Sequence, residues 1–166
     1  MKAPQGLLFF MKGLFSKRLP YLVSGRSWLL VCLQLVSLLY LAISAPVMAA
    51  HLSGLFIELA GIILAGSGLM KLNWKSFSVF PEPRPDGQLE TGGIYAFIRH
   101  PMYAGVFLIA STLVWEYPSA LRIACLILLG TVFILKINIE EAYLEKKYPS
   151  FQSWKKTSNR LIPFVW

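Results

Sequence analysis

The sequence predicts an all-α integral membrane protein with four transmembrane helices in two hairpins and a single domain over residues 1–166. Composition is the first reason, because 56% of the residues are hydrophobic and only 14% are charged, against about 25% charged residues in a typical soluble chain. So few charged side chains could not cover a soluble domain, and a disordered chain would be poor in apolar residues. The second reason is a set of four long apolar runs, and the third is a charge distribution that follows them.

The first apolar run, residues 27–45, contains no charged residue. About 20 apolar residues span a bilayer, so we expect this run to be a transmembrane helix. A cleaved signal peptide, with Ala45 near the cleavage site, is the competing interpretation. However, the run is longer than the roughly 7–15 apolar residues of a signal peptide, and a second run follows at once. We therefore interpret the first run as a membrane anchor.

The second run, residues 52–70, has one charged residue, Glu58, near the outer end of the predicted helix. Gly61, Ala65 and Gly68 fall on one helical face. Such a row of small residues lets a neighbouring helix approach closely.

Prolines in short connections predict that the four runs form two hairpins. Pro46 lies between the first two runs. The third run, residues 103–117, is short for a transmembrane helix, and Pro118 separates it from the fourth, residues 119–138.

The basic residues give the predicted helices a direction. Sixteen Lys and Arg against eight Asp and Glu give a net charge of +8. Fifteen of the sixteen lie before the first run, between the second and third, or from the end of the fourth onward, and only Arg122 falls on the other side. The positive-inside rule then predicts that both termini and the central loop are cytoplasmic. In so apolar a chain, this excess favours membrane lipid as a partner and argues against nucleic acid.

Two flanking segments carry both apolar and basic residues and are not predicted to span. Residues 7–19 are expected to lie in the membrane interface. The tail from Leu144 is expected to be a C-terminal amphipathic helix, whose aromatic residues act as interfacial anchors. These aromatic residues are Tyr148, Phe151, Trp154, Phe164 and Trp166.

The central loop, residues 71–99, is the most polar stretch and the first candidate for function. A loop of this length in a small protein is usually functional or disordered. It ends at His100, and Pro101 suits the first turn of the third helix. Free N–H groups at a helix start suit an anionic group.

The predicted topology brings the start of the third helix and the end of the fourth to the same face. Residues about forty positions apart are therefore expected to meet. They are Arg99, His100 and Tyr103 on one side and Lys136, Glu140 and Glu141 on the other. Simpler interpretations remain, because a histidine at a helix start can be a cap and adjacent glutamates can be a solvated face. Neither Cys32 nor Cys125 belongs to a metal-binding pattern, and no metal site is predicted.

Taken together, these motifs resemble a known family. The pattern is Arg-His-Pro-x-Tyr-x-Gly after a Gly-x-Tyr loop, then an apolar run, Glu-Glu, and a tail that ends in Arg-Leu-Ile-Pro. It resembles the isoprenylcysteine carboxyl methyltransferase family, to which phospholipid N-methyltransferases are related. The resemblance covers roughly residues 72–164, which form the motif-bearing core.

The resemblance implies an integral membrane methyltransferase that uses S-adenosylmethionine in a cytoplasmic pocket closed by the loop and tail. Its acceptor would be a lipophilic small molecule or a lipidated substrate. The residues implied to contact the cofactor are Gln88, Leu89, Glu90, Tyr95, His100, Pro101, Met102, Tyr103, Glu140 and, with it, Glu141.

Lys136 or Arg99 is expected to orient an anionic methyl acceptor. Lys136 stands where the carboxyl methyltransferases have a substrate-binding arginine. A lysine keeps the positive charge but lacks the two-pronged geometry that suits a carboxylate. The acceptor therefore stays open between a carboxylate, an amine and a thiol, and so does the oligomeric state.

Two other functions remain as alternatives. Some sterol reductases that bind NADPH resemble the same C-terminal region, although they are usually longer. A non-enzymatic membrane subunit that has kept the scaffold is the third possibility, which the intact His100, Tyr103 and Glu140 argue against.

Overall fold

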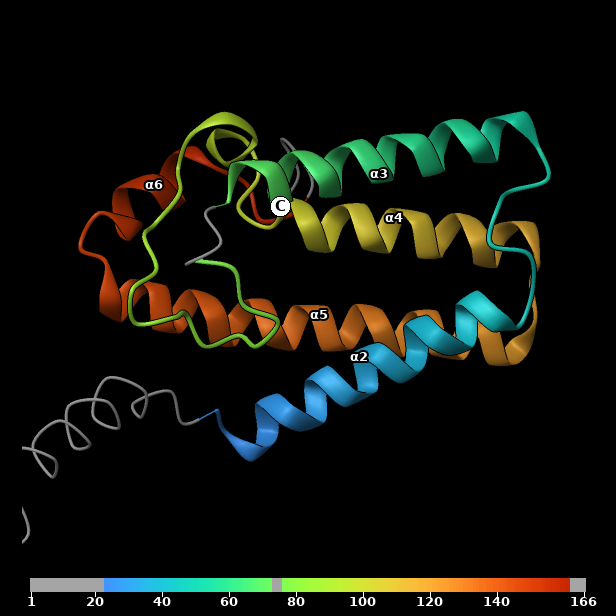
Figure 1. Cartoon of the computed structure of the whole chain (residues 1–166), viewed down its shortest axis with the longest axis horizontal. Coiled ribbons are helices and arrows are strands. Elements are labelled where there is room, and N and C mark those ends of the chain that lie inside the picture. Colours follow the sequence, from blue (N-terminus) through green and yellow to red (C-terminus); the bar gives the residue numbers. More distant parts are fainter. Residues whose placement is uncertain (1–22, 73–75, 162–166) are drawn as a thin grey trace, which may run out of the picture.

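The computed structural model describes residues 23–72 and 76–161, and the regular elements in these ranges are all helices (Figure 1). The predicted interfacial segment at residues 7–19 lies outside them, as do Phe164 and Trp166. The elements are α2 (Gly25–Ile43), α3 (Leu52–Lys71), the 3-10 helix η1 (Gly93–Ala96), α4 (Pro101–Glu116), α5 (Ala120–Lys147) and α6 (Phe151–Thr157).

Within these two ranges, three of the helices, α2, α3 and α5, are long and apolar enough to cross a membrane. The third predicted span corresponds to α4, which is shorter at 16 residues and begins at Pro101, as expected. By contrast, α5 has 28 residues and continues past the predicted end at Asn138 to Lys147. At 1.5 Å per residue it is about 42 Å long, longer than the roughly 30 Å apolar core of a bilayer. Its last turns therefore reach beyond the apolar run and carry Glu140 and Glu141.

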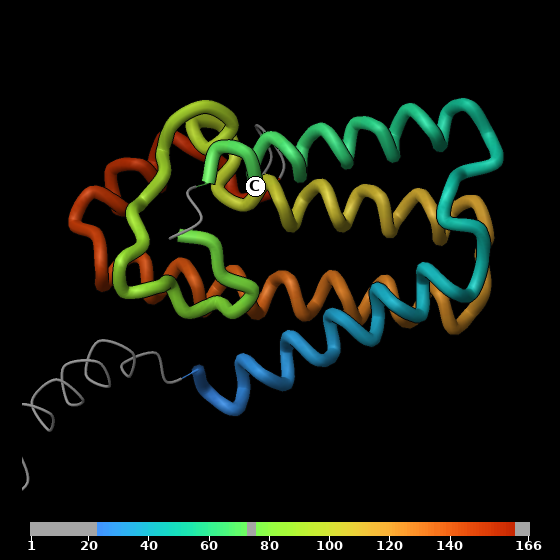
Figure 2. The backbone as a smooth tube through the Cα atoms, viewed as in Figure 1, coloured from blue at the N-terminus to red at the C-terminus, as the bar shows by residue number. Residues whose placement is uncertain are grey.

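The helices pack in a different pairing from the predicted one. In the structure α3 lies along α4 and α2 lies along α5, while α4 also contacts α5 (Figures 1 and 2). The expected packing of α2 against α3 is therefore not confirmed. Their connection, residues 44–51, crosses the end of the bundle (Figure 2). A short connection sets opposite helix directions, but side-chain shape decides which helices touch.

Small residues explain why α3 selects α4. A Cβ on Gly61 would lie 2.9 Å from the backbone oxygen of Gly105, and a Cβ on Gly105 would lie 2.6 Å from the nitrogen of Ala65. Gly68 similarly abuts Pro101, where a Cβ would come within 2.8 Å of the proline ring. The predicted small-residue face of the second span is thus confirmed, and it sets α3 against the start of α4.

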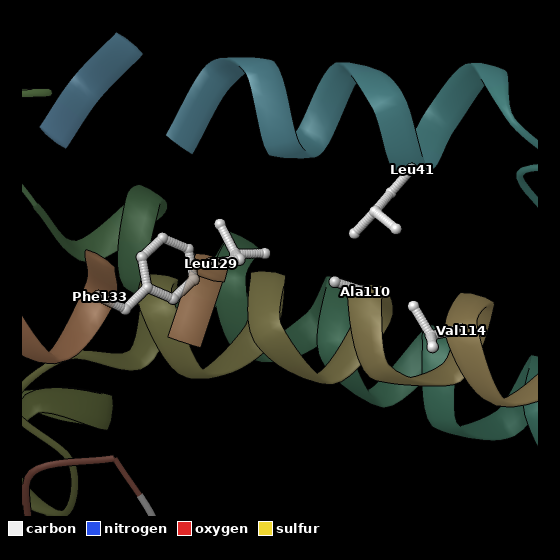
Figure 3. Packing of buried hydrophobic residues seen from close by; sticks show 5 residues of the cluster. All are labelled: Leu41, Ala110, Val114, Leu129 and Phe133. Carbon is white, nitrogen blue, oxygen red and sulfur yellow. The ribbon is translucent and has the colours of Figure 1, made fainter. Parts of the chain in front are cut away.

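The apolar core lies where α2, α4 and α5 meet. Figure 3 shows Leu41 of α2 directed towards Ala110 and Val114 of α4, with Leu129 and Phe133 of α5 alongside. Phe133 also packs against Tyr103, with ring centroids 5.0 Å apart. This contact joins the core to the candidate site.

The end of the bundle away from the central loop is held by buried polar groups. Arg122, the basic residue that the sequence sets apart from the others, is 3% exposed and donates to the carbonyls of Leu41 and Leu113. It thereby links the ends of α2, α4 and α5. Glu58 is also buried, and its Oε2 accepts a hydrogen bond from the Ala49 nitrogen at 3.2 Å.

Candidate active site

The start of α4 and the end of α5 meet, as predicted. Tyr103 Oη donates to Glu140 Oε2 at 3.3 Å, and His100 Nδ1 lies 3.9 Å from the same oxygen. Arg99 Nε donates to Glu141 Oε1 at 2.9 Å. The crossing of α4 and α5 therefore brings together residues about forty positions apart.

These residues surround one cavity, which also lies beneath the central loop. Eleven of the twelve residues singled out from the sequence line it. They are Gln88, Leu89, Glu90, Tyr95, Arg99, His100, Pro101, Met102, Tyr103, Lys136 and Glu140. The loop and the two helix ends thus contribute to a single hollow, although their roles in binding stay predictions.

Glu141 is the exception, and its expected contact with a cofactor stays a prediction. It does not line the cavity, and its side chain is 3% exposed. One oxygen accepts from Arg99, and the other accepts from Arg160 Nη2 at 2.8 Å. His100 Nε2 is 3.4 Å away. Because both oxygens already have basic partners, Glu141 holds the protein together beside the cavity.

Arg99 has a similar structural part. Besides Glu141, its Nη1 donates to the carbonyls of Lys155, at 3.1 Å, and of Ser158. The guanidinium therefore joins the end of α5 to the C-terminal segment. The expected role of Lys136 or Arg99 in orienting an acceptor stays a prediction.

The C-terminal segment, residues 151–160, packs against the residues just before α4 and does not lie free as an anchor. We call this segment the C-terminal strap. Residues Ile98 and Asn159 form a parallel bridge, and Arg99 N donates to the Asn159 carbonyl at 2.8 Å. Phe151 is fully buried, and Trp154 Nε1 donates to the Tyr95 carbonyl at 2.9 Å. The interpretation of Phe151 as an interfacial anchor is thus wrong, because its side chain is fully buried in the protein. The interfacial role of Trp154, which is only partly buried, stays a prediction.

Tyr95 forms part of the cavity wall nearest α3. Its hydroxyl donates to the Gly68 carbonyl at 3.3 Å. Burial raises the pKa of this phenol well above its ordinary value, and the negative charges of Glu140 and Glu90 raise it further. Tyr95 therefore stays a neutral hydrogen-bond donor over the physiological pH range.

Lys136 lies deep in the cavity wall at 1% exposure. Its Nζ donates to Gln34 Oε1 at 2.5 Å and to the Val79 carbonyl at 2.9 Å. It also lies 5.3 Å from the centroid of the Tyr103 ring, within the range of a cation–π interaction. Two N–H groups of the buried ammonium are thus bonded to uncharged acceptors, one from α2 and one from the loop.

The loop closes the cavity through contacts that the sequence did not reveal. Glu82 Oε1 accepts from Ser27 Oγ at 2.5 Å and from Ser24 N at 3.3 Å, which ties the loop to the start of α2. Glu82 is 7% exposed, and no described residue bonds to its Oε2. At the other side, Tyr148 and Lys147 donate to the Gly87 carbonyl.

Sequence reasoning missed several residues that line the cavity, among them Gln34, Glu82, Tyr148 and Trp154. Gln34 did carry a signal, since a polar side chain inside an apolar transmembrane run usually has a function or a specific partner. The others had none, because a charged loop residue and tail aromatics are common on any surface.

Comparison with known proteins indicates the family to which the chain belongs. Residues 49–150 match the model of the phospholipid methyltransferase family, which is more than half of the chain. The chain therefore belongs to the phospholipid methyltransferase family. Family membership and three long apolar helices together indicate a membrane methyltransferase.

A curated relative has a more specific name. Over 97 residues, the chain is 34% identical to a protein-S-isoprenylcysteine O-methyltransferase from Schizosaccharomyces pombe. The match covers 55% of this chain and 40% of the relative. The chain thus matches less than half the length of this relative, and it has a family relationship to isoprenylcysteine methyltransferases.

Proposed function

We propose that the protein transfers a methyl group from S-adenosylmethionine to a lipophilic acceptor at the cytoplasmic face of a membrane. The observation that carries this proposal is the cavity where the loop, the start of α4 and the end of α5 meet. It combines polar side chains with a place at one end of a bundle of apolar helices.

The residues around the cavity suit this cofactor. S-adenosylmethionine has a positive sulfonium, an amine, hydroxyls and a flat purine. The cavity offers carboxylates at Glu90 and Glu140 and aromatic faces at Tyr95 and Tyr103. Carboxylates accept from amines and hydroxyls, and aromatic faces attract cations and pack against flat rings.

Each residue then has a part in positioning. Glu140, held by Tyr103 and close to His100, would accept a hydrogen bond from a hydroxyl or the amine of the cofactor. Gln88 and Leu89 of the loop would cover it. The cofactor supplies a methyl group on a positively charged sulfur, which is already reactive towards a nucleophile. The protein mainly has to hold donor and acceptor in line and exclude water.

A lipophilic acceptor explains why the enzyme is built in a membrane. Its apolar chain would lie along the helices, and its polar end would enter the cavity from the side. Lys136 would orient an anionic group on that end. The basic residues favour a cytoplasmic loop and cytoplasmic termini.

Transfer of radiolabelled methyl groups tests the proposal. Purified protein in vesicles would be given labelled S-adenosylmethionine with either a total lipid extract or a prenylated peptide. The proposal predicts label in one of these organic products. Absence of label together with consumption of NADPH would favour the reductase alternative, and neither activity would favour a non-enzymatic subunit.

A further inference from the structure

Gln34 reaches the cavity from α2, a helix that contributed no residue to the predicted site. Its Oε1 accepts a hydrogen bond from Lys136 Nζ at 2.5 Å. An ammonium group has donors only, so the amide atom that faces it must be the oxygen. The amide nitrogen Nε2, with two N–H donors, must then point away from Lys136, and no described residue accepts a hydrogen bond from it.

Lys136 also has a donor to spare. Of its three N–H groups, one is directed at Gln34 Oε1 and one at the Val79 carbonyl. Among the described residues no hydrogen bond uses the third. The bond between the two side chains therefore keeps unused donors of an ammonium and of an amide next to each other in the wall of the cavity.

We propose, on the basis of the methyltransferase function proposed above, that Gln34 and Lys136 together bind an oxyanion of the methyl acceptor. The oxyanion is a carboxylate or a phosphate at the polar end of a lipid. A single lysine gives one point charge, whereas a carboxylate or phosphate is best held at two of its oxygens. The amide of Gln34 supplies the second point, which makes Gln34 a residue that determines specificity for the acceptor.

The charges around the pair make directed donors necessary. Glu82 and Glu140 line the same cavity as Lys136, so positive charge alone would select an anion poorly. Glu82 is held by Ser27, and Glu140 by Tyr103. Each carboxylate thus has one oxygen bonded to a partner other than Lys136, and the amide and ammonium N–H groups are left for the ligand.

Binding of simple amphiphiles to the purified full-length chain tests this subsite without using catalysis. The probes are dodecyl phosphate and laurate, with dodecanol as the uncharged control, in micelles of an uncharged maltoside detergent. Isothermal titration would measure each affinity. The Gln34→Glu variant keeps an oxygen for Lys136 but replaces the amide donors with a second oxygen. Loss of hydrogen bonds to a charged group predicts at least about tenfold weaker binding of an anionic probe, with no change for dodecanol.

Two further variants separate recognition from structure. Ser37→Ala is the matched control, since Ser37 is buried about one turn further along α2 and does not line the cavity; its anion affinity should equal that of the native chain. Gln34→Ala should lose affinity, and adding Lys136→Arg should restore part of it, because a guanidinium carries its own second donor. A change in helix packing alone would not be rescued by an arginine.

Native affinity for both anionic probes in Gln34→Glu would overturn the subsite. A selective loss for laurate would identify a carboxylate acceptor, and a selective loss for dodecyl phosphate a phosphate-bearing one. Titration with S-adenosylmethionine in the same samples keeps the two proposals apart. Intact cofactor binding without any effect of Gln34 would remove only the subsite. An anion effect without cofactor binding would support the subsite and remove the proposed function.

Discussion

At the scale of single residues, two adjacent glutamates have different surroundings. Glu140 lines the cavity and is bonded to Tyr103, while Glu141 faces away and is bonded to Arg99 and Arg160. Neighbouring positions on a helix point about 100° apart. One turn of α5 can therefore place Glu140 at the cavity and Glu141 against the C-terminal strap. Mutations at the two positions should therefore have different consequences.

The Glu141→Gln variant tests this division. Removing one partner from a buried ion-pair network is destabilising by on the order of 3 kcal/mol. In Glu141→Gln this should loosen the attachment of the C-terminal strap, which Arg99 and Arg160 bind. We expect faster trypsin cleavage after Lys155 and Lys156. Glu145→Gln, on the exposed side of the same helix, is the control. Equal cleavage rates in the two variants would contradict the structural role of Glu141.

At the scale of elements, the contact between α3 and α4 depends on missing side chains. Gly61→Ala would place a methyl group 2.7 Å from Ile109 Cγ1 and 2.9 Å from the Gly105 carbonyl. Such overpacking costs roughly 1–3 kcal/mol. We predict a lower thermal unfolding midpoint in detergent, because the start of α4 at Pro101 would be held less closely against α3.

Gly66→Ala is the matched control on the same helix. A Cβ there meets nothing within 4 Å, and alanine favours a helix over glycine by about 0.5–1 kcal/mol. Its midpoint should be equal to or above that of the native chain. A fall as large as that of Gly61→Ala would mean that close packing is not what selects α4.

The positions of the helices could be predicted from this sequence, but their packing partners could not. Apolar runs gave the positions of α2 and α3 within a few residues, because the length of a span is set by the bilayer. They did not give the partner of each helix, which depends on where Gly61 and Gly105 allow close approach. Nor did they give the end of α5, because its last turns carry charged residues and leave the apolar pattern.

The candidate site was predictable where topology alone determines proximity. Arg99, His100 and Tyr103 meet the end of α5 because α4 and α5 are consecutive helices that run in opposite directions (Figure 1). Gln34 and Glu82 were not predicted, since their place depends on how α2 packs against α5 and how the loop folds over it. Glu141 shows the same limit, as the sequence does not say which of two adjacent carboxylates faces inward.

At the scale of the whole molecule, the sequence predicts that the basic residues lie on the side of the membrane that carries the cavity, with Arg122 as the exception. Its guanidinium is buried among helix ends, so it offers little charge to solvent.

The orientation of the molecule can be tested with a chain in which Cys32 and Cys125 are replaced by alanine. Asp86→Cys should then react with an impermeant maleimide from the cytoplasmic side, and Ser53→Cys from the opposite side. The reverse pattern would contradict a cytoplasmic cavity.

The central claim is that the cavity between the start of α4 and the end of α5 binds S-adenosylmethionine. Isothermal titration of the purified protein with this cofactor tests it most directly, using Glu140→Gln and, as the control, Glu145→Gln on the same helix. We predict saturable binding by the native chain and the control, and about tenfold weaker binding or more in Glu140→Gln, because a charge-assisted hydrogen bond is lost. Equal affinity in all three proteins, or no binding by the native chain, would contradict the account.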